Sequence, residues 1–143
     1  MIRVAINGYG RIGRSVLRAL YESDARSMVN VVAINELADC KTIGHLTRYD
    51  STHGRFPGTV EISNDQLCIN GDSITILHSE KIDQLPWGEL DIDVVLECSG
   101  AFADRATAQL HIDSGARRVL FSQPAESNVD ATIVYGINQD ALT

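Results

Sequence analysis

Positive charge is scarce in this sequence of 143 residues, in which 12 lysines and arginines stand against 19 aspartates and glutamates, for a net charge of -7. Nucleic acids and anionic membranes bind proteins through basic surfaces, so the composition argues against both kinds of partner. The sequence also lacks an apolar run of about 18 residues, which a membrane-spanning helix requires. Its first residues lack the basic segment and apolar core of a signal peptide. We therefore expect a cytoplasmic protein that binds neither nucleic acid nor a membrane.

Cysteine is also scarce, with three residues at positions 40, 68 and 98 and no Cys-x-x-Cys pair. An odd number of widely spaced cysteines indicates neither a disulfide framework nor a zinc motif. The four histidines show no metal-ligand spacing either, so the sequence predicts reduced thiols and no metal site. A chain of this length buries roughly 70% of its unfolded surface, so one globular domain can form without such crosslinks.

Strand and helix patterns alternate along the chain. Alternation of Ile and Val with Arg and Ala predicts a strand at Ile2–Asn7, a near-continuous apolar run predicts a buried strand at Val29–Asn35, and further strands are predicted at 93–98, 119–121 and 132–135. Helices with one apolar face are predicted over 11–22 and 104–114, the second ending at Gly115, and Asp39 is placed to cap a short helix that carries Tyr49. This alternation is typical of a doubly wound sheet.

Period-two alternation replaces the longer apolar runs between positions 59 and 78. Three short strands are predicted at 59–62, 66–70 and 73–78, and Asn70-Gly71 is a strong hairpin signal. The sequence thus predicts a Rossmann-type α/β fold, a doubly wound and mostly parallel sheet with a small antiparallel β insertion.

The strongest chemical signal is a G-x-G-x-x-G motif, formed by Gly8, Gly10 and Gly13 between the first strand and the first helix. In a dinucleotide-binding fold the first glycine permits a tight turn, the second admits the pyrophosphate, and the third lets the helix approach the sheet. The amides at the helix start then face the phosphates, which allows an acidic protein to bind an anionic cofactor. The alternative is that these glycines only form a turn.

Glu36 directly follows the second predicted strand, where this fold places the acid that binds the adenosine ribose. A carboxylate there repels the 2′-phosphate of NADP, and neither Leu37 nor Ala38 supplies a compensating cation. The position predicts NAD as the cofactor, unless Glu36 is only a solvated residue at a strand end.

Two later strands end in Ser99-Gly100 and in Ser122. Ligands of doubly wound sheets lie beyond the carboxyl ends of the strands, where these hydroxyls can bind ribose, phosphate or nicotinamide. Ordinary turn chemistry is the alternative. Cys98 is predicted to be a small buried side chain rather than a nucleophile, because no histidine or basic residue lies near it in the sequence.

Five segments stand out along the whole chain: VAINGYGRIGR at 4–14, VAINE at 32–36, YDSTHGRF at 49–56, ECSGAF at 97–102 and VYGIN at 134–138. Together they resemble the amino-terminal half of the phosphorylating glyceraldehyde-3-phosphate dehydrogenase family. Within it the chain looks most like the bacterial D-erythrose-4-phosphate dehydrogenases, on the segments INELAD at 34–39, LH at 77–78 and LPW at 85–87.

The resemblance implies cofactor contacts for six residues: Arg11 and Ile12 to the pyrophosphate, Glu36 to the adenosine ribose, Ser99 and Gly100 to the cofactor wall, and Ser122 to the nicotinamide side. One position departs from the family. Seven residues before Trp87, where the family commonly has an arginine beside the adenine, this chain has Glu80 followed by Lys81. A backbone contact to the adenine is compatible with that change.

The family oxidises an aldehyde through a thioester on a cysteine, with a histidine as base and NAD as hydride acceptor. That cysteine lies in a segment of the type Ser-x-x-Cys-Thr-Thr-Asn-Cys, and none of the three cysteines here has this context. We therefore expect residues 1–143 to be the NAD-binding Rossmann domain of a longer homotetrameric enzyme. The chain alone is predicted to hold no catalytic residue and to be inactive.

The implied substrate is a sugar phosphate, D-erythrose 4-phosphate, which is oxidised to 4-phosphoerythronate in pyridoxal phosphate synthesis. Glyceraldehyde 3-phosphate, the glycolytic substrate, is the nearest alternative. An alternative of another class is an NAD-binding sensor module that performs no chemistry.

Overall fold

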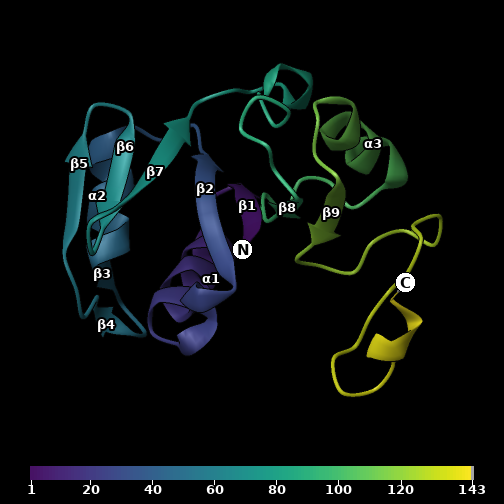
Figure 1. Ribbon diagram of the computed structural model, residues 1–143, viewed down its shortest axis with the longest axis horizontal. Helices are drawn as coiled ribbons and strands as arrows, with labels where there is room; N and C mark the ends of the chain where they lie inside the picture. The colour runs from purple at the N-terminus through teal and green to yellow at the C-terminus, as the bar shows by residue number, and fades with distance from the viewer. Residues whose placement is uncertain (143) are drawn as a thin grey trace.

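A seven-stranded sheet runs through the computed structural model, which describes residues 1–142 (Figure 1). Its strands are β1 (Ile2–Asn7), β2 (Val29–Asn35), β5 (Val60–Ser63), β6 (Gln66–Ile69), β7 (Asp72–Leu77), β8 (Val94–Glu97) and β9 (Arg118–Phe121). The helices are α1 (Arg11–Tyr21), α2 (Cys40–Arg48) and α3 (Arg105–Asp113), with 3-10 turns η1 (Asp24–Ser27), η2 (Ile82–Gln84) and η3 (Gln139–Ala141). A separate two-stranded hairpin pairs β3 (Tyr49–Asp50) with β4 (Gly54–Arg55).

The five strands β7, β2, β1, β8 and β9 are parallel neighbours in that order. The chain starts in the middle strand, builds outward through β2 to β7, and then returns to the other side of β1 to add β8 and β9. This is the Rossmann arrangement, and the change of direction occurs beside β1. The predicted doubly wound fold is confirmed.

The antiparallel strands continue the same sheet. β6 pairs antiparallel with both β5 and β7, and β7 pairs parallel with β2 through its other edge. The β6–β7 turn has positive φ at Asn70 (50°) and Gly71 (88°), as a two-residue hairpin of matching twist requires. β7, the last strand of the predicted insertion, is therefore also the third parallel strand of the first Rossmann half, beside β2 and β1.

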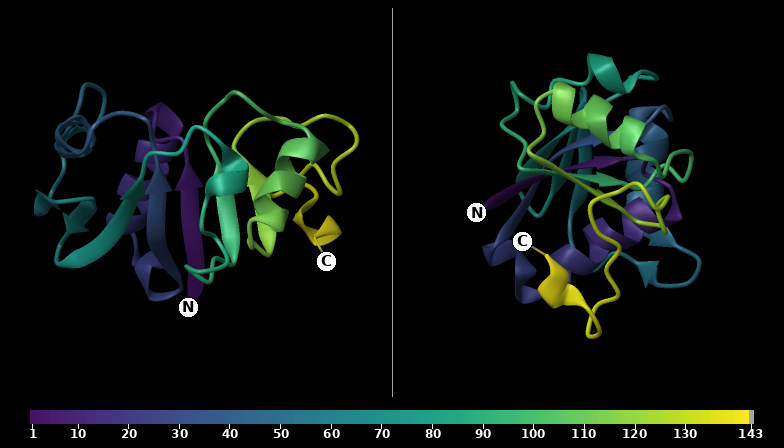
Figure 2. Two further views of the ribbon diagram at one scale, coloured as in Figure 1. Left: turned by 90° about the horizontal axis from the view of Figure 1, so that it is seen from above. Right: turned by 90° about the vertical axis from the view of Figure 1, so that its right-hand side faces the viewer.

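Two apolar cores lie on opposite faces of the sheet. One face packs against α1, which carries the buried Leu17, and against α2, which carries the buried Ile43 and lies over β5 and β6. The other face is covered by the segment that connects β7 to β8, whose Trp87 is completely buried, and by α3. Figure 2 shows the sheet between these two layers.

Side-chain caps fix where two helices begin. The carboxylates of Asp39 and Asp104 accept hydrogen bonds from Thr42 N (2.7 Å) and Thr107 N (2.9 Å), which confirms the predicted cap at Asp39. The helix that follows Asp39 ends at Arg48. Tyr49, which the sequence pattern placed in this helix, instead begins β3.

The strand predicted at 132–135 is wrong. The Asn138 side chain accepts a hydrogen bond from Val134 N (2.6 Å) and donates one to Thr132 O (2.9 Å), so it occupies main-chain groups that a strand ladder would use. Tyr135 is 94% exposed, so its ring does not pack against the sheet that the structure describes. This segment instead forms an irregular stretch beyond β9 (Figure 1).

No helix within residues 1–142 is both long enough and apolar enough to cross a membrane.

Candidate functional site

The five parallel strands end in register at one edge of the sheet. Leu77 is the partner of Asn35, Asn35 of Asn7, Asn7 of Glu97, and Glu97 of Phe121. Each predicted cofactor residue lies within six positions after one member of this row. The structure therefore brings residues that are spread from position 8 to position 122 to the same edge, beside the point where the strand order reverses.

The glycine turn has two closed sides and one open side. A Cβ on Gly8, whose φ is +92°, would lie 2.5 Å from Ser99 Cα, and a Cβ on Gly13 would lie 2.4 Å from Gly8 O. A Cβ on Gly10 would meet nothing within 4 Å. Packing thus requires the first and third glycines, whereas at Gly10 the open space fits a cofactor that approaches the backbone.

The start of α1 offers main-chain donors to an anion. Gly10 caps the helix with no side-chain hydrogen bond, and the first turn contains no acidic residue. The amides of this first turn have no partner within the helix and lie at the positive end of its dipole. Arg11 and Ile12 are exposed here, so a phosphate can reach their amides.

Tyr9 anchors the turn from inside. Its side chain is buried, and its hydroxyl lies 2.8 Å from Thr47 Oγ1 on α2. Burial raises the pKa of the Tyr9 phenol well above its ordinary value, so the group stays protonated. The Tyr9 amide donates to Glu36 Oε2 at 3.4 Å, which ties the turn to the end of β2.

Glu36 is held by its backbone on both sides. Its amide donates to Leu77 O (2.9 Å), and its carbonyl accepts from His78 Nδ1 (2.8 Å). The side chain is partly exposed at the strand edge, next to the glycine turn. The predicted ribose ligand therefore stands beside the predicted pyrophosphate cradle.

The Arg11 guanidinium does not extend freely into solvent. It donates a hydrogen bond to Thr52 Oγ1 at 2.6 Å in the β3–β4 loop. That loop is itself ordered by Asp50, whose carboxylate accepts from Thr52 N (2.7 Å) and His53 N (2.8 Å). Those backbone hydrogen bonds lower the pKa of Asp50. The Arg11 side chain is thus engaged by Thr52, and its backbone amide is the group available for the contact expected with a pyrophosphate.

A family profile described as glyceraldehyde 3-phosphate dehydrogenase, NAD binding domain, matches residues 2–105, well over half of the chain. The chain belongs to the glyceraldehyde-3-phosphate dehydrogenase family. Its cofactor is NAD. The matched part of this dehydrogenase-family chain contains the glycine turn, Glu36, Ser99 and Gly100, whereas Ser122 lies outside it.

A buried carboxylate that sequence reasoning did not single out connects the strand ends of this family domain. Glu97 accepts hydrogen bonds from Asn7 Nδ2 (2.7 Å), from Ser99 N (3.0 Å) and from the Ser99 hydroxyl. His111 Nε2 on α3 lies 2.8 Å from Glu97 Oε2, and Trp87 Nε1 donates to His111 Nδ1 at 2.9 Å. Since Nδ1 is the acceptor, the imidazole is neutral and donates through Nε2 to the carboxylate.

The same network continues across β1 to β2 and β7. Asn35 Nδ2 donates to Asn7 Oδ1 (2.8 Å) and to Ser79 O (3.0 Å), and Asn35 Oδ1 accepts from Ser79 N (2.9 Å). A signal for it was present in the sequence, because two apolar strands end in the same Ile-Asn pair. The network makes no contact that requires a cofactor, so it positions the edge.

Ser122 and Cys98 lie on the other side of β1, after β9 and β8. The amide of Ser122 donates to Glu97 O (3.1 Å), and its side chain is exposed beyond β9. Cys98 is half-buried, and burial raises the pKa of its thiol more than the Ser122 hydroxyl lowers it. A protonated thiol fits the apolar role expected for Cys98.

Glu80 and Lys81, at the position where the family commonly has an arginine beside the adenine, are exposed in the loop after β7.

Replacement of Glu97 by glutamine is expected to destabilise the protein by about 2–4 kcal/mol at neutral pH, because the amide nitrogen would face the donors of Asn7 or His111. Burial raises the pKa of Glu97, but the hydrogen bonds from His111, Ser99 and Asn7 together hold it below its ordinary value of 4.5. This stabilisation is therefore complete above pH 4.5 and is lost as the pH falls through the lower folded value.

Urea unfolding of the wild type and of Glu97→Gln across this pH range measures the effect. The difference between the two is expected to shrink in acid. Glu80→Gln, at an exposed position, serves as the control and is expected to change stability by less than about 0.5 kcal/mol. Equal stability of Glu97→Gln and wild type at neutral pH would contradict the assignment.

Proposed function

We propose that this chain is the NAD-binding part of an NAD-dependent dehydrogenase that oxidises a sugar-phosphate aldehyde. The observation that carries the proposal is the shared edge of the sheet, where the open side of Gly10, the uncapped start of α1 and the Glu36 carboxylate adjoin one another. The arrangement supplies donors for a pyrophosphate and an acceptor for a ribose at neighbouring positions.

Each residue has a distinct task in this proposal. The amides of Arg11 and Ile12 hold the pyrophosphate, and Glu36 accepts hydrogen bonds from the adenosine ribose. Ser99 and Gly100 form the wall next to Gly8, and Ser122 lies on the nicotinamide side. When bound, NAD supplies the acceptor for the hydride that leaves the aldehyde carbon.

Substitution of Gly10 by alanine is expected to weaken NAD binding at least tenfold, about 1.4 kcal/mol, because the added methyl group occupies the side that the pyrophosphate approaches. Thermal stability is expected to stay near that of the wild type, since the Cβ meets no protein atom within 4 Å. Calorimetric titration with NAD and thermal unfolding measure the two quantities. An unchanged NAD affinity of Gly10→Ala would contradict the assignment of Gly10 to the NAD site.

The Glu36 carboxylate is expected to make the protein prefer NAD to NADP, because it repels the 2′-phosphate. In Glu36→Gln the dissociation constant for NADP divided by that for NAD is expected to fall at least about tenfold, because the neutral amide repels no phosphate. The exposed Glu61 on β5 provides the control, and Glu61→Gln should leave the ratio unchanged. Tighter binding of NADP than of NAD by the wild type would refute the role of Glu36.

The proposed substrate is D-erythrose 4-phosphate, with 4-phosphoerythronate as product, in a pathway toward pyridoxal phosphate. The sequence segments INELAD at 34–39, LH at 77–78 and LPW at 85–87 support this member of the family over the glycolytic one. Glyceraldehyde 3-phosphate is the second candidate, because the chain's membership of the family is equally compatible with it.

The proposed enzyme is a cytoplasmic homotetramer in which residues 1–143 form the NAD-binding domain and the reactive cysteine and its histidine belong to a further domain. Two observations support the division. The matched family region is an NAD-binding domain. In addition, Val134, Tyr135 and Ile137 are 54%, 94% and 79% exposed, an apolar surface of the kind that another domain covers.

Turnover by the enzyme that contains this chain, measured as NADH formation, tests the substrate. We expect a higher kcat/KM for D-erythrose 4-phosphate than for glyceraldehyde 3-phosphate, and residues 1–143 alone should bind NAD but form no NADH with either aldehyde. A preference for glyceraldehyde 3-phosphate would select the glycolytic alternative. NAD binding without turnover by the native gene product would select the sensor.

A further inference from the structure

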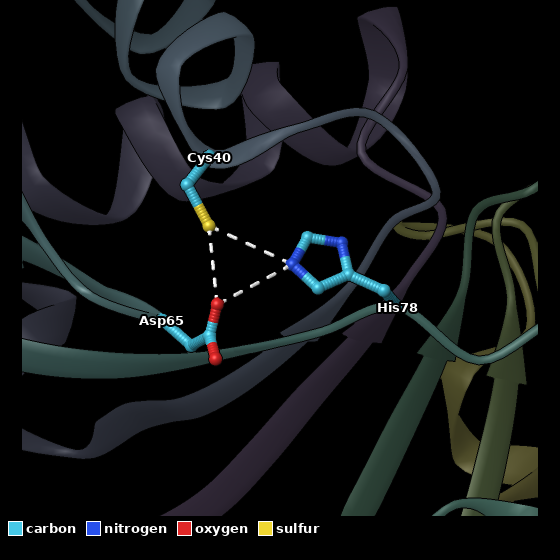
Figure 3. A group of neighbouring side chains, drawn as sticks. All are labelled: Cys40, Asp65 and His78. Atoms are coloured by element: carbon cyan, nitrogen blue, oxygen red, sulfur yellow. Dashed lines mark hydrogen bonds and ion pairs between the residues drawn. The ribbon is translucent and has the colours of Figure 1, made fainter.

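Three side chains that are far apart in the sequence meet beside the end of β7. Cys40 begins α2, Asp65 lies in the turn between β5 and β6, and His78 follows β7 (Figure 3). Cys40 Sγ lies 3.5 Å from Asp65 Oδ1 and 3.6 Å from His78 Nε2, and the remaining side of the triangle, from Nε2 to Oδ1, is 3.7 Å. The sequence spacing gave no indication of this cluster.

We propose that Cys40, Asp65 and His78 form a binding site for a divalent zinc ion. Zinc takes sulfur, nitrogen and carboxylate ligands at about 2.0–2.3 Å, so a tetrahedral ion separates neighbouring ligand atoms by roughly 3.3–3.7 Å. The two sides that include sulfur, 3.5 Å and 3.6 Å, match that separation, and the Nε2–Oδ1 side of 3.7 Å needs to shorten by only a few tenths of an ångström, within the reach of exposed side chains. The fourth position faces solvent, because Asp65 and His78 are exposed, and a water molecule can fill it.

The histidine is oriented as a metal ligand. His78 Nδ1 lies 2.8 Å from the carbonyl oxygen of Glu36, which can only accept, so Nδ1 carries the proton. In the neutral ring Nε2 then presents its lone pair toward Cys40 and Asp65. A histidine that ligates zinc usually donates its other nitrogen to a carbonyl or carboxylate in this way, which fixes the ring and its tautomer.

Hydrogen bonds hold the backbone at the other two ligands. The Asp39 cap fixes the first turn of α2 and with it the position of Cys40. Asp65 is fixed because its carbonyl accepts from Ile76 N at 2.7 Å, on the strand that leads to His78. Little conformational entropy is therefore lost when an ion binds, because the three ligand positions exist beforehand.

The donor set favours zinc over the common hard cations. Magnesium and calcium select six or more oxygen ligands, whereas a thiolate and an imidazole suit zinc and similar transition metals. Binding forms one bond from the ion to each of S, N and O, and the thiol proton passes to solvent. The site uses no side chain assigned to NAD, so its test is independent of the cofactor assignment.

Cobalt and zinc added alone to the full chain test the proposal. We expect one Co²⁺ per chain, with the thiolate-to-cobalt charge-transfer absorption of a cysteine ligand, and displacement of that cobalt by Zn²⁺. Competition with a chromogenic chelator measures the zinc affinity of Cys40→Ala and His78→Gln, and each variant should bind zinc at least tenfold more weakly than the wild type. Removal of a residue that only supports a ligand lowers metal affinity by about 10–100-fold, and removal of the ligand itself should lower it by no less.

Matched controls separate the site from general thiol or imidazole binding. Cys68→Ala and His53→Gln remove the same chemical groups elsewhere and should leave the zinc affinity unchanged, and circular dichroism of each variant reports whether it is folded. In the unmodified protein, zinc should slow alkylation of Cys40 but not of Cys68, a readout that needs no variant. Absence of the charge-transfer absorption, equal zinc affinity of Cys40→Ala and wild type, or undiminished alkylation of Cys40 would overturn the site.

Discussion

The buried carboxylate of Glu97 is the constraint on which the functional edge depends. A charge in the interior is tolerated only when hydrogen bonds surround it. Glu97 obtains them from β1 through Asn7, from the following turn through Ser99, and from α3 through His111. These donors satisfy the carboxylate together only when β1, β8 and α3 occupy their observed register, so one charge fixes how three elements meet.

The proposed site at this edge accounts for the binding of the doubly negative pyrophosphate of NAD by an acidic chain. The net charge of -7 gives the protein no overall attraction for phosphate. It instead presents the first amides of α1, whose direction is set by the turn from Gly8 to Gly13 and by the buried Tyr9. Partial charges that are already oriented lose little entropy on binding and require no desolvation of lysine or arginine side chains.

The antiparallel strands add a second role to the end of β2. The main chain of Glu36 bonds to Leu77 on one side and to His78 on the other, so β7 and the residue after it support the proposed ribose ligand. The same strand brings His78 to Asp65 and Cys40. The proposed zinc site and the proposed adenosine end of the NAD site therefore share one backbone segment while they use different side chains.

The sequence by itself determined the order of the elements, the parallel β-α-β unit, the glycine turn and the position of Glu36. These features depend on local periodicity and on residues adjacent in the chain, such as the hairpin at Asn70-Gly71. The strand predicted at 132–135 was wrong because its apolar pattern says nothing about the competing hydrogen bonds from Asn138.

Only the tertiary structure decided the Glu97–His111 network, the attachment of Arg11 to Thr52, and the meeting of Cys40 with Asp65 and His78. Each of these contacts joins residues from separate elements. Their distances follow from strand register and helix placement, which arise from the packing of the whole sheet and are not encoded in the spacing of any one segment.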